Sequence, residues 1–204
     1  MKINPKTHDK FFNILKAVVV PRPIAFISTQ STKGVLNLAP FSFFNGVCYE
    51  PPIVSVAISR FAGSKPKDSL VNIEETGEFV INLVSQDIAQ AMNKTAAEFP
   101  SSINEFEIAG LTTAPSDIVM APRVAESPAS LECKLKQVVA INEGTPKECG
   151  LVIAEVVYCH INDELFDGRH VDIKGLNVIG RLGGHSYCAV DNEFEMILPV
   201  YKPE

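Results

Sequence analysis

The chain has 204 residues, of which 46% are hydrophobic and 21% are charged, and its net charge is −6. These values are ordinary for a globular protein with a full core, they exclude disorder on the scale of a whole domain, and the length predicts one domain over residues 1–204. The negative charge argues against a nucleic-acid binder with a broad basic face, although a few cations and backbone N–H groups in one pocket would still hold a small anion.

The composition also bears on where the protein works. No apolar stretch is long enough to span a bilayer and residues 1–10 are polar, so we expect neither a membrane segment nor a signal peptide. Five cysteines occur without a C-x-x-C pair: Cys48, Cys133, Cys149, Cys159 and Cys188. We interpret them as reduced thiols of a cytoplasmic protein.

Strand patterns and turns alternate in the first third of the chain. Ile24–Gln30 is predicted to be a strand, followed by a turn in which Gly34 supplies a positive φ. Residues 35–47 are apolar but interrupted by a proline and a glycine. Pro52–Ser59 alternates between apolar and polar side chains, which predicts a strand with Val54, Val56 and Ile58 on one face.

Two helices are predicted next. Asp68–Thr76 has a helical pattern that Asp68 or Ser69 would cap, and Gly77 follows where a helix commonly ends on glycine. Asp87–Phe99 is predicted to be a second helix, with Ile88, Ala91, Met92 and Thr95 on one side.

Strands dominate the remaining pattern. Phe79–Val84 is predicted to be a strand between the two helices, and residues 100–128 form a loop-rich excursion of the length typical of lids, binding segments or partner arms. Leu131–Ile141 and Leu151–His160 are predicted strands joined by a turn at residues 142–148, and the second is the longest candidate for a buried strand. The whole pattern predicts a mainly β protein, a closed or nearly closed antiparallel barrel with added helices.

Several common catalytic motifs are missing from the sequence. It holds no G-x-G-x-x-G after a strand, no phosphate loop, no H-E-x-x-H and no G-x-S-x-G, and its four histidines are scattered without ligand spacing. We therefore expect no metal and no catalytic side chain. An enzyme with so few acid–base candidates would borrow its reactivity from a cofactor.

Residues 37–46 (NLAPFSFFNG) have a pattern suited to a flat ligand. Proline, glycine and small residues interrupt the strand, which frees backbone N–H and C=O groups to bond the edge of a planar heterocycle. Ala39 and Pro40 leave room for a flat ring. On residue types alone, a core strand with a bulge remains an alternative.

A second pattern is suited to a phosphate. Lys65 and Lys67 precede the predicted helix start, and Ser64 and Ser69 flank them. Lysines and hydroxyls at a helix N-terminus favour phosphate binding, although a solvated helix cap would have the same residue types.

These stretches, taken in order, resemble the flavin reductase-like FMN-binding split-barrel family. The matching motifs are PRPIAFIST (21–29), NLAPFSFFNGV (37–47), PPIVSVAI (51–58), KDSLVNIEETGEFVINL (67–83), NEFEIAGLT (104–112), ESPASLEC (126–133) and RLGGHSY (181–187). They cover nearly the whole chain and are specific in combination rather than singly. Ser69 stands where threonine is common in the family, and the hydroxyl is kept.

The resemblance implies an antiparallel split barrel that binds FMN, usually as a homodimer, and it implies roles for particular residues. Ser28 and Thr29 would lie near the ribityl–phosphate chain. The isoalloxazine would be edged by Ala39, Pro40, Phe41, Ser42, Asn45 and Gly46, and the phosphate end held by Arg60, Ser64, Lys65, Lys67 and Ser69. At the far side of the pocket would lie Arg181, Gly183, Gly184 and Tyr187. For Arg181 and Tyr187, a turn with a packed ring is an equal alternative.

The function implied is an NAD(P)H-dependent flavin reductase, an enzyme that transfers hydride from NADH or NADPH to FMN and passes electrons to a monooxygenase, an electron-transfer protein or iron. The main alternative is a flavoredoxin-like electron carrier whose tightly bound FMN is reduced by a protein partner. A flavin storage module and a pyridoxamine-phosphate oxidase-like enzyme are more distant alternatives.

Overall fold

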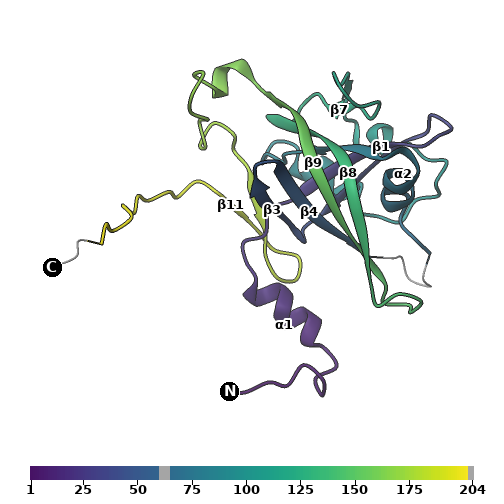
Figure 1. Cartoon of the computed structure of the whole chain (residues 1–204), viewed down its shortest axis with the longest axis vertical. Coiled ribbons are helices and arrows are strands. Elements are labelled where there is room, and N and C mark those ends of the chain that lie inside the picture. Colours follow the sequence, from purple (N-terminus) through teal and green to yellow (C-terminus); the bar gives the residue numbers. More distant parts are fainter. Residues whose placement is uncertain (60–64, 202–204) are drawn as a thin grey trace.

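In the computed structural model, which describes residues 1–59 and 65–201, seven strands form one antiparallel sheet in the order β2-β1-β5-β8-β9-β4-β3 (Figure 1). The helices are α1 (Phe11–Val18), α2 (Asp68–Thr76), α3 (Ala89–Lys94) and α4 (Glu105–Ala109), with a 3₁₀ turn at Asp163–Leu165. The sheet strands are β1 (Ala25–Gln30), β2 (Leu36–Phe41), β3 (Phe44–Tyr49), β4 (Pro52–Ser59), β5 (Glu78–Asn82), β8 (Ala129–Ile141) and β9 (Cys149–Ile161). Two short ribbons pair β6 (Thr113–Ala114) with β7 (Arg123–Val124) and β10 (Ile179–Arg181) with β11 (Tyr187–Ala189).

The connection between β2 and β3 requires the sheet to curl into a barrel. These strands lie at opposite edges of the sheet, yet only Ser42 and Phe43 join them. A flat sheet of this size would hold its edge strands about 29 Å apart, whereas the three Cα–Cα steps from Phe41 to Phe44 span at most about 11 Å. The backbone N–H of Ala57 in β4 donates to the Phe43 carbonyl at 2.8 Å, which anchors the connection. The result is an antiparallel barrel split between β2 and β3.

Side-chain alternation along the strands builds two apolar cores. Inside the barrel, Ile27 of β1 packs with Phe79 and Ile81 of β5, and the predicted inward face of β4 (Val54, Val56 and Ile58) is buried with them. The next residue of β1, Phe26, points the other way and packs in a second core under α3 and α4. β1 is therefore buried on both faces.

Several local predictions are confirmed and two are wrong. Gly34 and Gly77 adopt φ values of +81° and +74° at the predicted turn and helix end. The N-cap of α2 is Lys67, and no side chain caps the helix, so neither Asp68 nor Ser69 has the predicted capping role. The predicted helix 87–99 shrinks to α3, because its chain turns at Thr95, whose hydroxyl donates back to the Met92 carbonyl.

The long hairpin β8–β9 crosses the barrel (Figure 1). Its turn at residues 142–148 is as predicted. The candidate buried strand, β9, has buried residues only in its first half, and Tyr158 and Cys159 in its second half are exposed. Register shifts in the hairpin bend it, which lets its far end leave the core.

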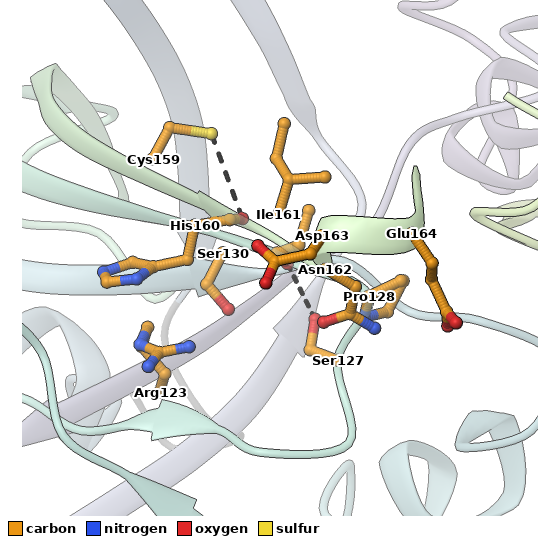
Figure 2. Close-up of a pocket in the computed structure, with 11 residues that line it drawn as sticks. Arg123, Ser127, Pro128, Ser130, Cys159, His160, Ile161, Asn162, Asp163 and Glu164 are labelled. Atoms are coloured by element: carbon orange, nitrogen blue, oxygen red, sulfur yellow. Dashed lines mark hydrogen bonds between the residues drawn. The ribbon is translucent and has the colours of Figure 1, made fainter. Parts of the chain in front are cut away.

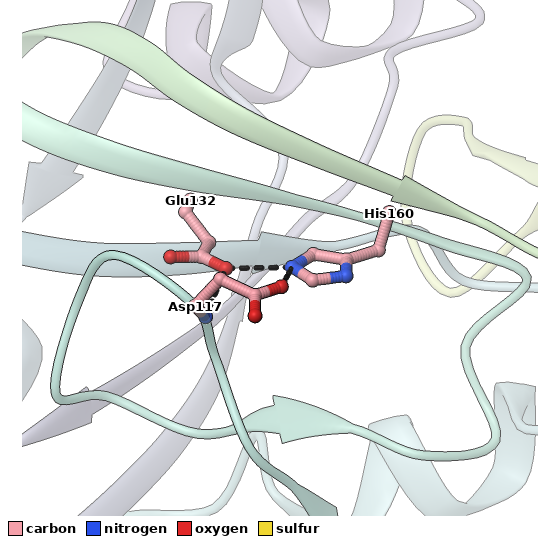
Figure 3. Close-up of side chains that lie close together, drawn as sticks. All are labelled: Asp117, Glu132 and His160. Carbon is pink, nitrogen blue, oxygen red and sulfur yellow. Dashed lines mark hydrogen bonds and ion pairs between the residues drawn. The ribbon is translucent and has the colours of Figure 1, made fainter.

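The excursion at residues 100–128 holds α4 and the β6–β7 ribbon and is anchored to the barrel by Glu132. This β8 carboxylate is fully buried and accepts the backbone N–H groups of Asp117, Ile118 and Val119 at 2.7–2.9 Å. Nε2 of His160 on β9 lies 2.6 Å from Oε1 of Glu132, the oxygen that also accepts the Asp117 N–H (Figure 3). Burial raises the pKa of Glu132, but the hydrogen bonds from His160 and the three N–H groups outweigh it and hold that pKa below its usual value.

Arg22 anchors α1 and the C-terminal ribbon to the barrel. Its buried guanidinium donates to the carbonyls of Lys16, Val19 and Leu182 and lies 3.3 Å from the Ser42 hydroxyl. Burial, together with the charge of Arg181, lowers the pKa of Arg22. One side chain thus holds the N-terminal helix, the β2–β3 connection and the turn after β10 in one place.

The structure bears on the state of the cysteines and on the search for membrane-spanning helices. All five cysteines are free thiols, as predicted. Among the described residues, no helix is long and apolar enough to cross a membrane.

Replacing Glu132 with glutamine is expected to destabilise the protein strongly. The amide would place N–H donors against backbone donors, so we expect Glu132→Gln to lower the free energy of unfolding by about 3–5 kcal/mol at pH 7. Because the native pKa lies below the unfolded value of about 4.3, this contribution is complete above that value and is lost as the pH falls through the native pKa. Urea unfolding of both proteins at pH 7, and at a series of pH values that falls below about 4.3, measures both effects.

The matched control is Glu155→Gln. Glu155 pairs with the half-exposed Lys136 at 2.5 Å on the same hairpin, and loss of such a surface pair is expected to cost less than about 1 kcal/mol. Equal losses from the two substitutions would contradict the role given to Glu132.

Candidate functional site

A small polar cleft lies between β2, the start of α2 and the start of α4. The cleft encloses about 60 Å³, well below the roughly 300–1,000 Å³ of pockets that enclose a whole drug-sized ligand. A phosphate-sized group suits it, and a larger ligand would extend beyond it. Four residues predicted from the sequence line it together: Ala39, Pro40, Lys67 and Ser69.

Buried hydrogen bonds fix the floor of the cleft. Asn37 donates from Nδ2 to the hydroxyl of Ser69 at 2.8 Å, and its Nδ2 lies 3.4 Å from Thr29 Oγ1. Asn72 of α2 also donates to Thr29, at 2.9 Å. Because the Ser69 oxygen accepts the bond from Asn37, the Ser69 hydroxyl keeps its own proton to donate to a ligand. The strand β1, the strand β2 and the helix α2 are thereby locked together at this point.

The cation of the cleft among the described residues is Lys67, the N-cap residue directly before α2. Its ammonium lies 6.0 Å from the centre of the Phe41 ring. Burial lowers the pKa of Lys67, and the nearby charge of Glu98 acts in the opposite direction. Backbone N–H groups at the start of a helix carry a partial positive charge, so Lys67, Ser69 and the α2 N-terminus together favour an anion.

Glu105 is a cleft residue that the sequence analysis missed. It begins α4, is buried, and accepts the backbone N–H of Leu38 at 3.0 Å. Burial raises the pKa of Glu105, the hydrogen bond from Leu38 opposes this, and the charge of Asp68 adds to the rise. In the sequence, Glu105 belongs to the NEFEIAGLT motif. No pattern in the neighbouring residues predicts that it lies beside β2.

Other predicted residues lie outside the cleft. Ser28 is fully buried and its hydroxyl donates to the Pro122 carbonyl at 2.5 Å, on the opposite side of β1 from Thr29. Ser42 contacts Arg22 in the β2–β3 connection, and Asn45 and Gly46 lie exposed on β3. Lys65 is exposed before α2, while Phe41 is buried at the end of β2. Arg60 and Ser64 lie outside the described residues.

The predicted far-side residues form a separate group. Arg181 lies over the Tyr187 ring at 4.3 Å and donates to the Gly184 carbonyl at 2.6 Å, which is the geometry of a turn with a packed ring. Gly183 packs against α1, where an added Cβ would approach Ala17 to 3.1 Å. A hollow of about 450 Å³ beside this turn is lined by Arg181, His185 and Tyr187.

A larger hollow than the cleft lies elsewhere, at the far end of the β8–β9 hairpin (Figure 2). It measures about 650 Å³, and its lining includes Arg123, His160 and the acidic Asp163 and Glu164. The hydroxyl of Ser130 in its wall already bonds to Asn82 at 2.9 Å. This hollow carries charges of both signs and contains none of the site residues predicted from the sequence. It therefore lacks the combination of a lysine, a serine hydroxyl and a helix start that the smaller cleft has.

Asp117, Glu132 and His160 place potential metal ligands within 4.8 Å of one another (Figure 3). Both oxygens of Glu132 are already engaged, one by Asp117 N–H and His160 and the other by the N–H groups of Ile118 and Val119. A cation would have to displace these donors. The cluster therefore serves to hold the 117–119 loop.

The strand order and the polar cleft beside β2 define the class of protein: an antiparallel split barrel with added helices. The flavin reductase like domain family matches residues 17–175, and the chain belongs to this family. The family and fold predicted from the sequence are confirmed, and membership supports an oxidoreductase with a flavin cofactor.

Solved structures agree with this assignment. The chain is similar to nitrilotriacetate monooxygenase component B from Bacillus cereus, with 35% identity, a TM-score of 0.91 and coverage of 96% of this chain and 98% of that one. It is also similar to the 2-nitrobenzoate 2-nitroreductase NbaA of Pseudomonas fluorescens, with 30% identity, a TM-score of 0.88 and coverage of 100% and 99%. A split-barrel domain protein from Shewanella frigidimarina (21% identity, TM-score 0.83, coverage 98% and 100%) shares the fold alone.

The raised pKa of Glu105 has a measurable consequence for stability. A folded-state pKa above the unfolded value means that wild-type stability falls as the pH rises from the unfolded value through the folded one. Glu105→Gln removes this titration, so the stability of the variant minus that of the wild type should grow from pH 4 to pH 8. Urea midpoints at these pH values measure the difference.

Glu107→Gln changes an exposed glutamate on the same helix and should follow the wild-type profile. If the stability of Glu105→Gln minus that of the wild type stays constant or shrinks as the pH rises, the raised pKa assigned to Glu105 is contradicted.

Proposed function

We propose that the protein is an NAD(P)H-dependent flavin reductase that binds FMN through the cleft between β2 and α2. The observation that carries the proposal is the pairing of Lys67 and Ser69 at the start of α2, directly beside the Ala39–Pro40 segment of β2. Lys67 and Ser69 suit a phosphate, and the Ala39–Pro40 segment suits the edge of a flat ring. A flavin mononucleotide has both parts, and the flavin reductase like family to which the chain belongs supports a flavin over other phosphate-bearing ring compounds.

The phosphate end of FMN fits the enclosed part of the cleft. Lys67 would supply a cation, the Ser69 hydroxyl would donate its proton, and the α2 N-terminus would add its partial charge. Arg60, Ser64 and Lys65 keep their predicted phosphate roles in this proposal. Asn37 and Asn72 would act behind them, since they hold Thr29 and Ser69 in place.

The ring would extend out of the cleft along β2 toward the split in the barrel. Ala39, Pro40 and Phe41 on β2, with Ser42 in the connection and Asn45 and Gly46 on β3, keep their predicted place at its edge. β2 and β3 are sheet edges, so each has backbone N–H and C=O groups on one side that no strand of this sheet pairs. Backbone donors of this kind would orient a heterocycle and stabilise negative charge on it.

FMN, when bound, would supply the redox chemistry by accepting a hydride from NADH or NADPH. The chain's task is to bind and orient both molecules and to limit the access of water, for which no side-chain acid or base is required. Arg181 keeps its predicted place at the far side of the pocket. A homodimer is expected, and the similarity to a monooxygenase component makes a monooxygenase the first class of electron acceptor to test.

Lysine substitutions test the phosphate site. Lys67→Ala is expected to weaken FMN binding by about 10–100-fold and riboflavin binding little, because only FMN carries the phosphate and a charge-assisted hydrogen bond contributes about 1.5–3 kcal/mol. Lys65→Ala, which changes an exposed lysine two residues earlier, should have a smaller effect. Flavin fluorescence titration gives both dissociation constants, and equal losses for the two flavins would contradict the assignment.

Electron supply is tested by an anaerobic visible spectrum of the protein with FMN, before and after NADH or NADPH is added. We expect the flavin bands to shift on binding and to bleach within seconds with at least one nucleotide. A bound flavin that stays oxidised with both would favour the electron carrier reduced by a protein partner. Unshifted bands, with no flavin retained on the protein, would contradict the flavin site itself.

A further inference from the structure

Both ends of the chain expose apolar side chains that the rest of the chain does not cover. Helix α1 contains Phe11, Phe12, Ile14, Leu15, Ala17 and Val18, and none of its residues is buried. Asn13 and Lys16 give the helix one polar side, and an apolar helix face as wide as the remaining one is normally covered by protein. The Phe12 ring lies 6.0 Å from the ring of Phe43, and the Lys16 ammonium lies 4.5 Å from its centre, yet Phe12 stays exposed.

The C-terminal segment, residues 191–201, also exposes large apolar side chains. It is neither helix nor strand, and Figure 1 shows it leaving the body beyond β11 and running away from the barrel. Its large apolar side chains are 81–94% exposed: Phe194, Met196, Ile197, Leu198, Val200 and Tyr201. So many large apolar groups in eleven exposed residues are typical of a segment that packs on another surface.

The charges of the two ends are complementary. Residues 1–18 hold Lys2, Lys6, Lys10 and Lys16 against the single carboxylate of Asp9. Residues 191–201 hold Asp191, Glu193 and Glu195 and no lysine or arginine. Within the chain, Glu193 lies 3.4 Å from Lys174 on the body of the protein, and among the described residues no ion pair joins the two ends.

We infer that residues 191–201 form an arm that packs against α1 of a second copy of this chain, while the arm of that copy packs against α1 of the first. In such a two-fold pair each contact occurs twice, so both exposed surfaces of both chains are covered at once. Charge complementarity favours a second copy over an unrelated partner, because the surface that matches the acidic, apolar arm is present on the chain itself. Eleven extended residues reach about 36 Å, which is enough to cross to a neighbouring subunit.

Truncation tests the arm. We expect the full-length chain to be dimeric at micromolar concentration in sedimentation or light scattering, and the chain ending at Val190 to be mostly monomeric under the same conditions. Circular dichroism and thermal melting show that the truncated chain is folded. A monomeric full-length chain, or a truncated chain that dimerises as tightly, would overturn the inference.

Charge reversal tests which surface the arm meets, and in which copy. One variant carries Asp191→Lys with Glu195→Lys, and the other carries Lys6→Glu with Lys10→Glu; each alone should weaken the dimer about tenfold or more. An equimolar mixture should recover a heterodimer, since each arm then faces an oppositely charged helix. Glu143→Lys, at the tip of the β8–β9 hairpin, is the control and should leave dimerisation unchanged.

The mixture also separates a second copy from a fold-back within one chain. If the arm packs on its own α1, the mixture recovers nothing, whereas combining all four substitutions in one chain restores stability without a dimer. That result would overturn the inference. None of these readouts depends on flavin binding, so they are independent of the proposed function.

Discussion

The two-residue connection between β2 and β3 is the constraint on which the rest of the structure depends. Ser42 and Phe43 join the two edges of a seven-stranded sheet, so the sheet has to close upon itself. Closure buries the inner faces of β1, β4 and β5 and leaves the split between β2 and β3 as an open edge. Arg22 reinforces this point, because it contacts Ser42 while it holds α1 and the turn after β10.

Two buried glutamates, Glu132 and Glu105, have pKa values shifted in opposite directions because they accept different numbers of hydrogen bonds. Glu132 accepts three backbone N–H groups and contacts His160, so it stays ionised and fastens the excursion to the barrel. Glu105 is also buried but accepts only the Leu38 N–H outside its own helix, and its pKa is raised. The first carboxylate is structural, whereas the second gives the cleft a charge that depends on pH.

The larger hollow and the cleft whose side chains suit an anion lie at different places on this molecule. The hollow near Arg123 and His160 has about eleven times the volume of the cleft at Lys67 (about 650 against 60 Å³), but its walls bear mixed charges and hydroxyls that are already bonded. The smaller cleft combines a cation, a hydroxyl with a proton to donate and a helix start. It also lies on the motifs that carry the family resemblance, so the chemical argument and the family assignment agree.

The sequence alone determined what depends on near neighbours along the chain. Apolar alternation predicts β1 and β4, and glycines at 34 and 77 predict a turn and a helix end, because backbone preference is local. The motifs predict the family and the cleft residues on β2 and α2. Only the tertiary structure decided the strand order, the absence of a side-chain cap at the start of α2 and the burial of Glu105 and Glu132. Those features depend on distant contacts, such as Glu105 with Leu38 across 67 residues, and local patterns carry no information about which segment will cover a charge.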